Sequence, residues 1–167
     1  MEKPFYQEGL HFECKRCSFC CGHSPGYVYL SKRDLLTLCK YFDCNIEDFV
    51  KKYCRWAGYY EGKTVLALFE KKNYDCILWN NGCTAYPARP VQCSTYPFWT
   101  WMIEDQDTWN ECAKDCPGMN SGKLWPKEKI LADSTAYQNN TPITREEVLQ
   151  LMEEEKGKYV ESRHAHA

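Results

Sequence analysis

The sequence contains no run of about 18 consecutive apolar residues, the length that a membrane-spanning helix requires. Its first residues, 1–9, also lack the apolar core of a secretory signal peptide. Charge of one sign is not in excess: the net charge is −2, and basic residues occur as pairs such as Lys32-Arg33 rather than as a stripe. We therefore expect a cytoplasmic protein with no membrane partner and no nucleic-acid partner.

Common catalytic signatures are missing as well. We find no Ser-His-Asp set, no phosphate-binding glycine loop and no dinucleotide fingerprint. The sequence therefore leaves open whether the protein is an enzyme.

Cysteine, by contrast, is abundant, with 12 in a chain of 167 residues. Four of these cysteines form the run Phe12-x-Cys14-x-x-Cys17-x-x-Cys20-Cys21. Two residues between thiols allow a tight turn to bring both sulfurs onto one metal ion. In the cytosol, where thiols stay reduced, dense cysteines indicate metal binding rather than disulfides. A secreted disulfide scaffold is the alternative; it is disfavoured because the chain is long for that class and has no cysteine after Cys116.

The cysteines divide into two groups by their neighbours. Cys39, Cys44 and Cys54 lie on or between expected amphipathic helices, and we expect them to be small buried hydrophobes. The others lie in loops or at the edges of elements, where a loop can aim a thiolate at a metal. These predicted ligands are Cys14, Cys17, Cys20, Cys21, Cys76, Cys83, Cys93, Cys112 and Cys116.

Nine ligands exceed one tetrahedral site. Because neighbouring side chains in an extended segment point in different directions, Cys20 and Cys21 can serve different sites. Two four-ligand sites with one spare thiol, or one cluster with extra structural thiols, both fit the number. Spacing alone does not assign the partners.

Zinc and iron–sulfur centres both accept four thiolates. Zinc ribbons use two separate Cys-x-x-Cys knuckles, and only the first half of this chain has that form. Three thiols at Cys-x-x-Cys-x-x-Cys, with the remote Cys116-Pro117, are closer to the ligand run of bacterial ferredoxins. The pattern favours an iron–sulfur cluster, with 4Fe–4S the favoured type and zinc the alternative.

Three motifs together resemble the YkgJ-type cysteine-cluster family of zinc- or iron-chelating domains. They are the run that begins at Phe12, the segment Cys83-x-x-Tyr86-x-x-Arg89-Pro90-x-x-Cys93-x-x-Tyr96-Pro97-Phe98, and Cys116-Pro117-Gly118. The likeness covers about residues 10–125. The family pattern often has glycine where this chain has Ser18. The resemblance implies a small cytoplasmic metal-binding protein. A similar cysteine domain occurs in flagellin lysine N-methylases, although this chain lacks the bulk of such an enzyme.

Two further residues are candidates for cofactor binding. Arg89, which Pro90 holds in an extended conformation, can donate hydrogen bonds to cluster sulfurs or pair with a substrate carboxylate. A structural arginine bonded to backbone carbonyls is the alternative. Tyr96 is expected beside the cluster or in the core, rather than as a catalytic acid. His11 and His23 flank the cysteine run and are possible ligands or surface residues.

Three functional hypotheses are consistent with this cysteine pattern. The favoured one is a redox or electron-transfer protein that holds an iron–sulfur cluster and acts with a protein redox partner. The second is an iron–sulfur-dependent modifying enzyme with a substrate cleft near Arg89. The third is a structural zinc protein whose metal only contributes folding free energy.

For the fold, we expect a single α+β domain over residues 1–167, with a few helices and a small antiparallel sheet organised around Cys-ligated metal. The cysteine-cluster core spans about 10–125. Helices are predicted near 32–42, after Asn45 and at about 144–158, the last opened by a capping box at Thr144. Strands are predicted at 27–30, and at 64–69 paired with 74–79 as a hairpin. Residues 99–109 are considered for a strand, and 119–140 are expected to be irregular.

Overall fold

A computed structural model describes residues 3–22 and 25–164 of the chain. Within these ranges six α-helices, four β-strands and three short 3-10 helices follow one another. In chain order they are β1 (Leu10–Phe12), η1 (Phe19–Cys21), α1 (Lys32–Tyr41), α2 (Ile46–Tyr53), β2 (Cys54–Gly58), η2 (Tyr60–Gly62), β3 (Thr64–Leu68), η3 (Tyr86–Ala88), α3 (Val91–Ser94), α4 (Gln106–Asp115), β4 (Met119–Trp125), α5 (Lys127–Gln138) and α6 (Arg145–His164).

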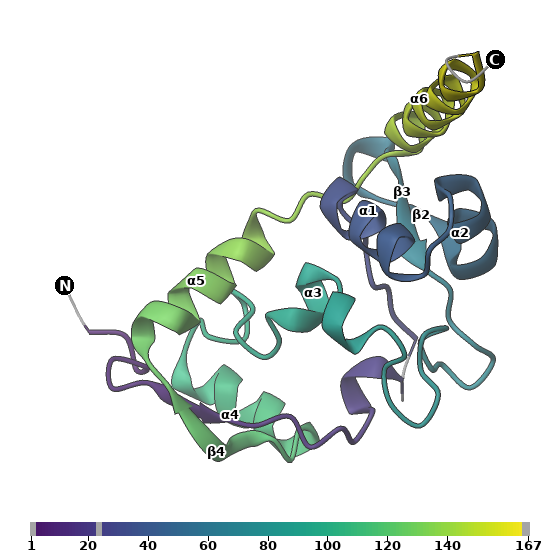
Figure 1. Cartoon of the computed structure of the whole chain (residues 1–167). Helices are drawn as coiled ribbons and strands as arrows, with labels where there is room; N and C mark the ends of the chain where they lie inside the picture. The colour runs from purple at the N-terminus through teal and green to yellow at the C-terminus, as the bar shows by residue number, and fades with distance from the viewer. Residues whose placement is uncertain (1–2, 23–24, 165–167) are drawn as a thin grey trace.

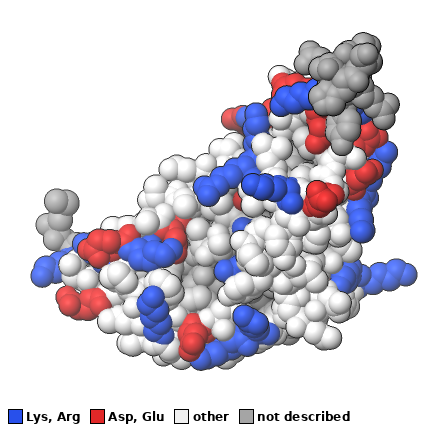
Figure 2. Space-filling model, in the orientation of Figure 1, with Lys and Arg blue, Asp and Glu red and all other residues white. Residues whose placement is uncertain are grey.

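The elements gather into two groups (Figure 1). One contains α1, α2, β2, β3 and α6; the other contains β1, β4, α4 and α5, and α3 lies between them. Each group has its own two-stranded antiparallel sheet, β2 with β3 and β1 with β4. The predicted α+β class is confirmed, with two small sheets where one was expected. On the face drawn in Figure 2, acidic and basic side chains are interspersed around a broad uncharged area.

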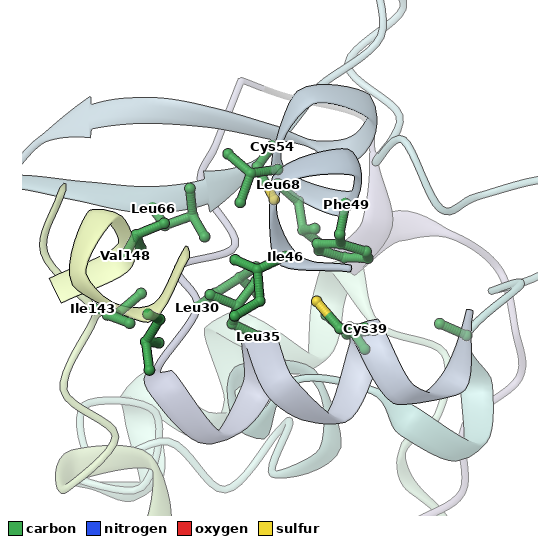
Figure 3. Packing of buried hydrophobic residues seen from close by; sticks show 14 of the residues in the cluster. Leu30, Leu35, Cys39, Ile46, Phe49, Cys54, Leu66, Leu68, Ile143 and Val148 are labelled. Carbon is green, nitrogen blue, oxygen red and sulfur yellow. The ribbon is translucent and has the colours of Figure 1, made fainter. Parts of the chain in front are cut away.

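The first group encloses a core of side chains from four elements (Figure 3). Leu35 of α1, Phe49 of α2, Leu66 of β3 and Val148 of α6 are all fully buried. Burying each such side chain contributes about 1.5–3 kcal/mol of hydrophobic free energy. The predicted helices are confirmed here, because local caps start them: Ser31 forms a capping box with Asp34, and the Asn45 side chain accepts from the Asp48 N–H.

The second group is built around aromatic residues. Trp109 of α4 is fully buried and stacks against Phe98, with ring centroids 6.1 Å apart. Ile130 of α5 and Met119 of β4 close this cluster from the other sides. The backbone of β1 is irregular between His11 and Phe12, where its register against β4 shifts.

Four predictions about the elements differ from the structure. β3 pairs with β2 rather than with 74–79, where only isolated bridges, Glu70 to Cys76 and Trp79 to Cys83, are formed. Residues 119–140 are not irregular, since they form β4 and α5. Trp109 lies in α4, not on a strand; Asp105 starts this helix by accepting from the Thr108 N–H. Residues 27–30 run along β3, with Leu30 N–H bonded to Leu66 O, but make a single bridge rather than a full strand.

The C-terminal helix is confirmed and extends to His164, further than predicted. Its capping box is present: the Glu147 carboxylate accepts from the Thr144 backbone N–H at 2.8 Å, and the Glu147 N–H donates to the Thr144 hydroxyl at 3.3 Å. Among the described helices, none combines the length and apolar character that crossing a membrane demands.

Candidate functional site

The first cysteine run folds as a tight loop between β1 and the start of the α1 region. Arg16 and Ser18 adopt positive φ values of 53° and 64°, which turn the chain sharply between successive cysteines. The short helix η1 then carries Cys20 and Cys21. The loop is tied down at both ends, by Glu13 N–H to Gly118 O at 3.1 Å and by Cys76 N–H to Cys21 O at 2.6 Å.

The second hydrogen bond joins the first run to the segment that carries Cys76, Cys83 and Cys93. A turn at Asn81 and Gly82, both with positive φ, brings Cys83 back beside Trp79. The segment then continues through η3 and Pro90 into α3, which holds Cys93. The Val91 N–H donates to the buried carboxylate of Asp34 at 2.9 Å, and this bond fixes the start of α3 against α1.

Gly118 explains why the third motif has glycine. A Cβ atom there would lie 2.5 Å from the backbone oxygen of Glu13, closer than any real side chain allows. Glycine thus permits the close approach that places the buried Cys116 beside the first loop.

These segments together enclose a cavity of about 360 Å³. Eight of the nine predicted ligands line it: Cys14, Cys17, Cys20, Cys21, Cys76, Cys83, Cys93 and Cys116. The ninth, Cys112, lines an adjoining cavity of about 400 Å³ that Cys20, Cys21 and Cys76 also border. Arg89 and Tyr96 line the cysteine cavity as well. The predicted ligands thus lie in one region, although they come from distant parts of the sequence.

The thiols line the cavity without converging on one point. Within residues 3–22 and 25–164, no three His, Cys, Asp or Glu side chains have the arrangement that holds a metal ion. The sulfurs of Cys20 and Cys21 are 3.9 Å apart, and all twelve cysteines, each in the described ranges, carry free thiols. The structure therefore brings eight of the nine predicted donor thiols to the lining of one cavity.

Burial and nearby thiols favour the protonated form of two of these residues, Cys20 and Cys93. The pKa of Cys20 is raised far above its ordinary value by its hydrogen bond with Cys21, and then by burial. The pKa of Cys93 is raised by burial and further by the nearby Cys76, Cys20 and Cys83. Arg89 acts in the opposite direction on both, since its positive charge favours the thiolates.

Arg89 itself is held by Tyr86. Its guanidinium lies over the Tyr86 ring at 3.7 Å from the centroid, and its Nε donates to the Tyr86 carbonyl at 3.1 Å. Arg16 approaches the same ring at 5.0 Å. Arg89 thus has the contacts of a structural arginine bonded to a backbone carbonyl, which is the alternative given above. Its positive charge also lowers the pKa of Cys20 and of Cys93.

Tyr96 lies among the thiols on the other side. Burial raises the pKa of its hydroxyl well above the usual range, followed by a hydrogen bond with Cys116 and by the nearby Cys20 and Cys112. Its ring packs edge-on against Phe12 and Trp99, at 6.1 and 5.3 Å. Three aromatic rings therefore form part of the wall at this end of the cavity.

The three cysteines that were expected to be structural do not line the cysteine cavity. Cys39 and Cys54 are in the first hydrophobic core, and Cys44 packs against it. His11 binds the Gly122 carbonyl through Nδ1 at 2.8 Å, and His23 lies outside the described residues. The buried Asp34, which positions α3, was missed as a contributor to the site. Its sequence signal was only that of a helix cap.

Comparison with known proteins adds little about function. No family model matches the sequence, and no solved structure is similar to it. An uncharacterized protein of the archaeon Methanocaldococcus jannaschii is 25% identical over 96 residues, which cover 56% of this chain and 48% of the relative. The chain thus spans about half the length of this curated relative.

Proposed function

We propose that this chain binds an iron–sulfur cluster, most simply of the 4Fe–4S type, through cysteine thiolates in the cysteine cavity. One observation carries the proposal: eight cysteines from three separate segments line a single cavity, all as free thiols. A chain that used these residues only for packing would not gather so many of them around open space. In this proposal the protein belongs to the cytoplasm, where thiols remain reduced, and to the YkgJ-type family.

Cysteine is the donor that iron–sulfur and zinc centres share, so the donor set fits the group. To bind the cluster, the cysteine sulfurs must also converge on one point in the cavity. Each cysteine side chain turns about a single torsion, χ1, so inward rotation of several thiols needs little change of the backbone. The proposed ligands of the first run, Cys14, Cys17, Cys20 and Cys21, line the same cavity as those of the later segments, Cys76, Cys83, Cys93 and Cys116.

A bound cluster would supply one-electron redox chemistry, exchanged with a protein redox partner. The chain's own groups would set the conditions for it. Arg89 offsets the negative charge of thiolates, and the wall of Tyr96, Phe12 and Trp99 limits water. Because the pKa values of Cys20 and Cys93 are raised, loading the site must release the protons that these thiols hold.

The test is anaerobic expression of the full chain, followed by elemental analysis and Mössbauer spectroscopy. We expect stoichiometric iron and sulfide and a brown protein. Stoichiometric zinc without iron would refute the proposal in favour of a structural zinc protein. Iron bound with an open coordination position, together with conversion of a substrate, would favour the modifying enzyme instead.

Matched variants separate ligands from structural thiols. Cys17→Ser and Cys93→Ser should lose most of the bound iron, because both residues line the cysteine cavity. Cys44→Ser should keep it, since Cys44 packs against the first hydrophobic core and does not line that cavity. Equal iron loss in all three variants would mean that the site is not where we place it. Circular dichroism shows in each case whether the variant has folded.

A further inference from the structure

A second large cavity, of about 820 Å³, lies beside α5 and contains no cysteine. We call it the tyrosine cavity. Residues of α5, the turn at 99–104 and the ends of the β2–β3 region contribute to it, together with Tyr6. Its lining consists of Tyr6, Tyr29, Tyr59, Gln92, Thr100, Trp101, Ile103, Glu104, Leu131, Ser134, Thr135, Tyr137, Gln138, Asn140 and Pro142. A volume of this size suits an organic ligand of two or three rings.

The charge of the lining limits the class of ligand. Among the described residues that line it, none is lysine, arginine or histidine, so a phosphate or carboxylate would enter without a counter-charge from them. The one carboxylate belongs to Glu104, which is exposed. A single exposed acid gives little selectivity for a cation, because water screens it. The lining therefore favours a neutral ligand.

Aromatic rings with fixed orientations form part of the wall. Tyr29 stacks on Tyr27 at 5.4 Å with ring planes 13° apart, and Tyr137 stacks on Trp99 at 5.0 Å with planes 11° apart. Trp101 makes a hydrogen bond with the Tyr137 hydroxyl, yet 49% of its surface is exposed. Rings held in this way offer flat apolar surfaces without a large loss of side-chain entropy on binding.

The same wall carries polar groups with unused hydrogen-bonding capacity. Among the residues that the structure describes, the hydroxyls of Tyr6, Tyr29 and Tyr59 and the side chains of Thr135 and Gln138 have no hydrogen-bond partner. Burial raises the pKa of Tyr29, so its hydroxyl remains a donor at neutral pH. Donors and acceptors that alternate with flat apolar surfaces match a ligand with hydroxyl groups around a ring.

From these features we propose that the tyrosine cavity binds a neutral saccharide of two or three sugar rings. The apolar C–H faces of the sugar would lie on the tyrosine and tryptophan rings, and its hydroxyls would pair with the free amide and hydroxyl side chains. An extended peptide fits less well, because the lining offers side-chain groups rather than an open strand edge for a backbone ladder. The inference is independent of metal, since no predicted ligand lines this cavity.

The test uses the full chain and isothermal titration calorimetry with maltose, cellobiose and diacetylchitobiose. Choline, glucose 6-phosphate and a neutral capped dipeptide serve as a cation, an anion and a peptide. We expect saturable binding of at least one of the three disaccharides and of none of the other probes. Trp101→Ala should weaken that binding about tenfold, because it removes an aromatic surface and a hydrogen-bonded neighbour of Tyr137.

Tyr74→Ala is the matched control. Tyr74 is a comparably exposed aromatic residue, at 46%, and it lines a different cavity. Its truncation should leave saccharide affinity unchanged. The proposal is overturned if none of the disaccharides binds, if choline, the phosphate or the dipeptide binds instead, or if Trp101→Ala and Tyr74→Ala have the same effect. Thermal unfolding of both variants shows that any loss of affinity is not a loss of fold.

Discussion

Single residues decide the shape of the first cysteine loop. Ser18 has φ 64° and ψ 3°, a left-handed conformation that costs an L-residue about 1 kcal/mol and costs glycine almost nothing. Its side chain makes no capping hydrogen bond that would offset this cost. The loop thus adopts the backbone that glycine prefers, at the position where the resembling family has glycine.

We therefore expect Ser18→Gly to raise the free energy of unfolding by about 0.5–1 kcal/mol and to keep metal binding intact. Ser18→Val should lower both the free energy of unfolding and the affinity for metal, because a β-branched side chain is the least compatible with this conformation. Urea denaturation and metal content of the two variants check the prediction. Equal stability of the glycine and valine variants would show that the loop does not hold this conformation.

Arg89 acts at the same scale through its charge. It lowers the pKa of Cys20 against the stronger opposing effects of the Cys21 hydrogen bond and of burial, and it lowers the pKa of Cys93 against the stronger effect of burial. Without it, protons compete better with metal for these thiols. Arg89→Met should thus weaken metal binding about tenfold, and the loss should be the same at about pH 6.5 and about pH 8, because both thiols stay protonated over this range in either protein.

Arg89→Lys separates charge from geometry, because lysine keeps the charge but loses the planar contact with Tyr86. Competition with a chromophoric chelator measures both variants. We expect the lysine variant to bind metal more tightly than the methionine variant. If the two are equally weak, the role of Arg89 lies in its stacking on Tyr86 and its bond to the carbonyl.

Among the elements, α1 has a role beyond its own core, because Asp34 joins it to two other segments. The carboxylate accepts from the Ser31 N–H at 3.0 Å, from the Val91 N–H at 2.9 Å and from the Asn140 side chain at 3.1 Å. It is 4% exposed, so its removal would leave the buried Ser31 donor and the part-buried Val91 and Asn140 donors without this acceptor.

Asp34→Ala should therefore lower the free energy of unfolding by about 3 kcal/mol and loosen the segment that carries Cys93. Asp107→Ala is the control: Asp107 also lies in the first turn of a helix but is exposed, and its loss should cost at most about 1 kcal/mol. Chemical denaturation gives both values. A small effect of Asp34→Ala would mean that water replaces the lost acceptor.

The elements also show what the sequence could predict. Helices α1, α2 and α6 start at local caps, and a cap and its helix lie within a few residues of each other. The partner of β3 was mistaken, because strand pairing depends on contacts that sequence order does not determine. Helix α5 was missed since its buried positions, Ile130 and Ser134, give almost no apolar repeat.

For the candidate site too, the sequence predicted local features and missed the contacts between distant segments. Spacing within the first run predicted a tight turn, and the other predicted ligands were expected in loops or at the edges of elements. The hydrogen bond from Cys76 to Cys21, which brings the two together, joins residues far apart in sequence and left no local signal. The tyrosine cavity was missed for the same reason, because its wall is assembled from scattered aromatic residues.

In the whole molecule, the cysteine cavity lies where the two hydrophobic clusters meet. Cys76 and Cys83 pack against the first cluster, whereas Cys112 and Cys116 belong to the second. In the proposed site, thiols from both clusters would bind the metal group, which would thus link the two halves. Metal binding would then stabilise the whole chain rather than one loop, by an amount set by the concentration and affinity of the metal.

The first cluster makes the stability of the whole molecule sensitive to alkali. Cys39 lies in that cluster, and burial raises its pKa from 9.0 to about 12. Burial also raises the pKa of Cys54, with Cys39 as a further cause. Since the folded state holds these protons more tightly than the unfolded state, the contribution to stability is complete below about pH 9. It is lost as pH rises through the folded-state pKa.

We expect the free energy of unfolding to fall between about pH 9 and about pH 12, by on the order of 3 kcal/mol from Cys39 over the full window. Cys39→Ala should have a flatter pH dependence there, although it is less stable near neutral pH because it leaves a small cavity. Leu36→Ala, on the exposed face of the same helix, should keep the wild-type slope. Lysine and tyrosine deprotonation contribute equally to all three proteins, so the difference in slope isolates the thiol. If Cys39→Ala loses stability with pH as steeply as the wild type, the Cys39 thiol does not titrate differently in the folded and unfolded chains.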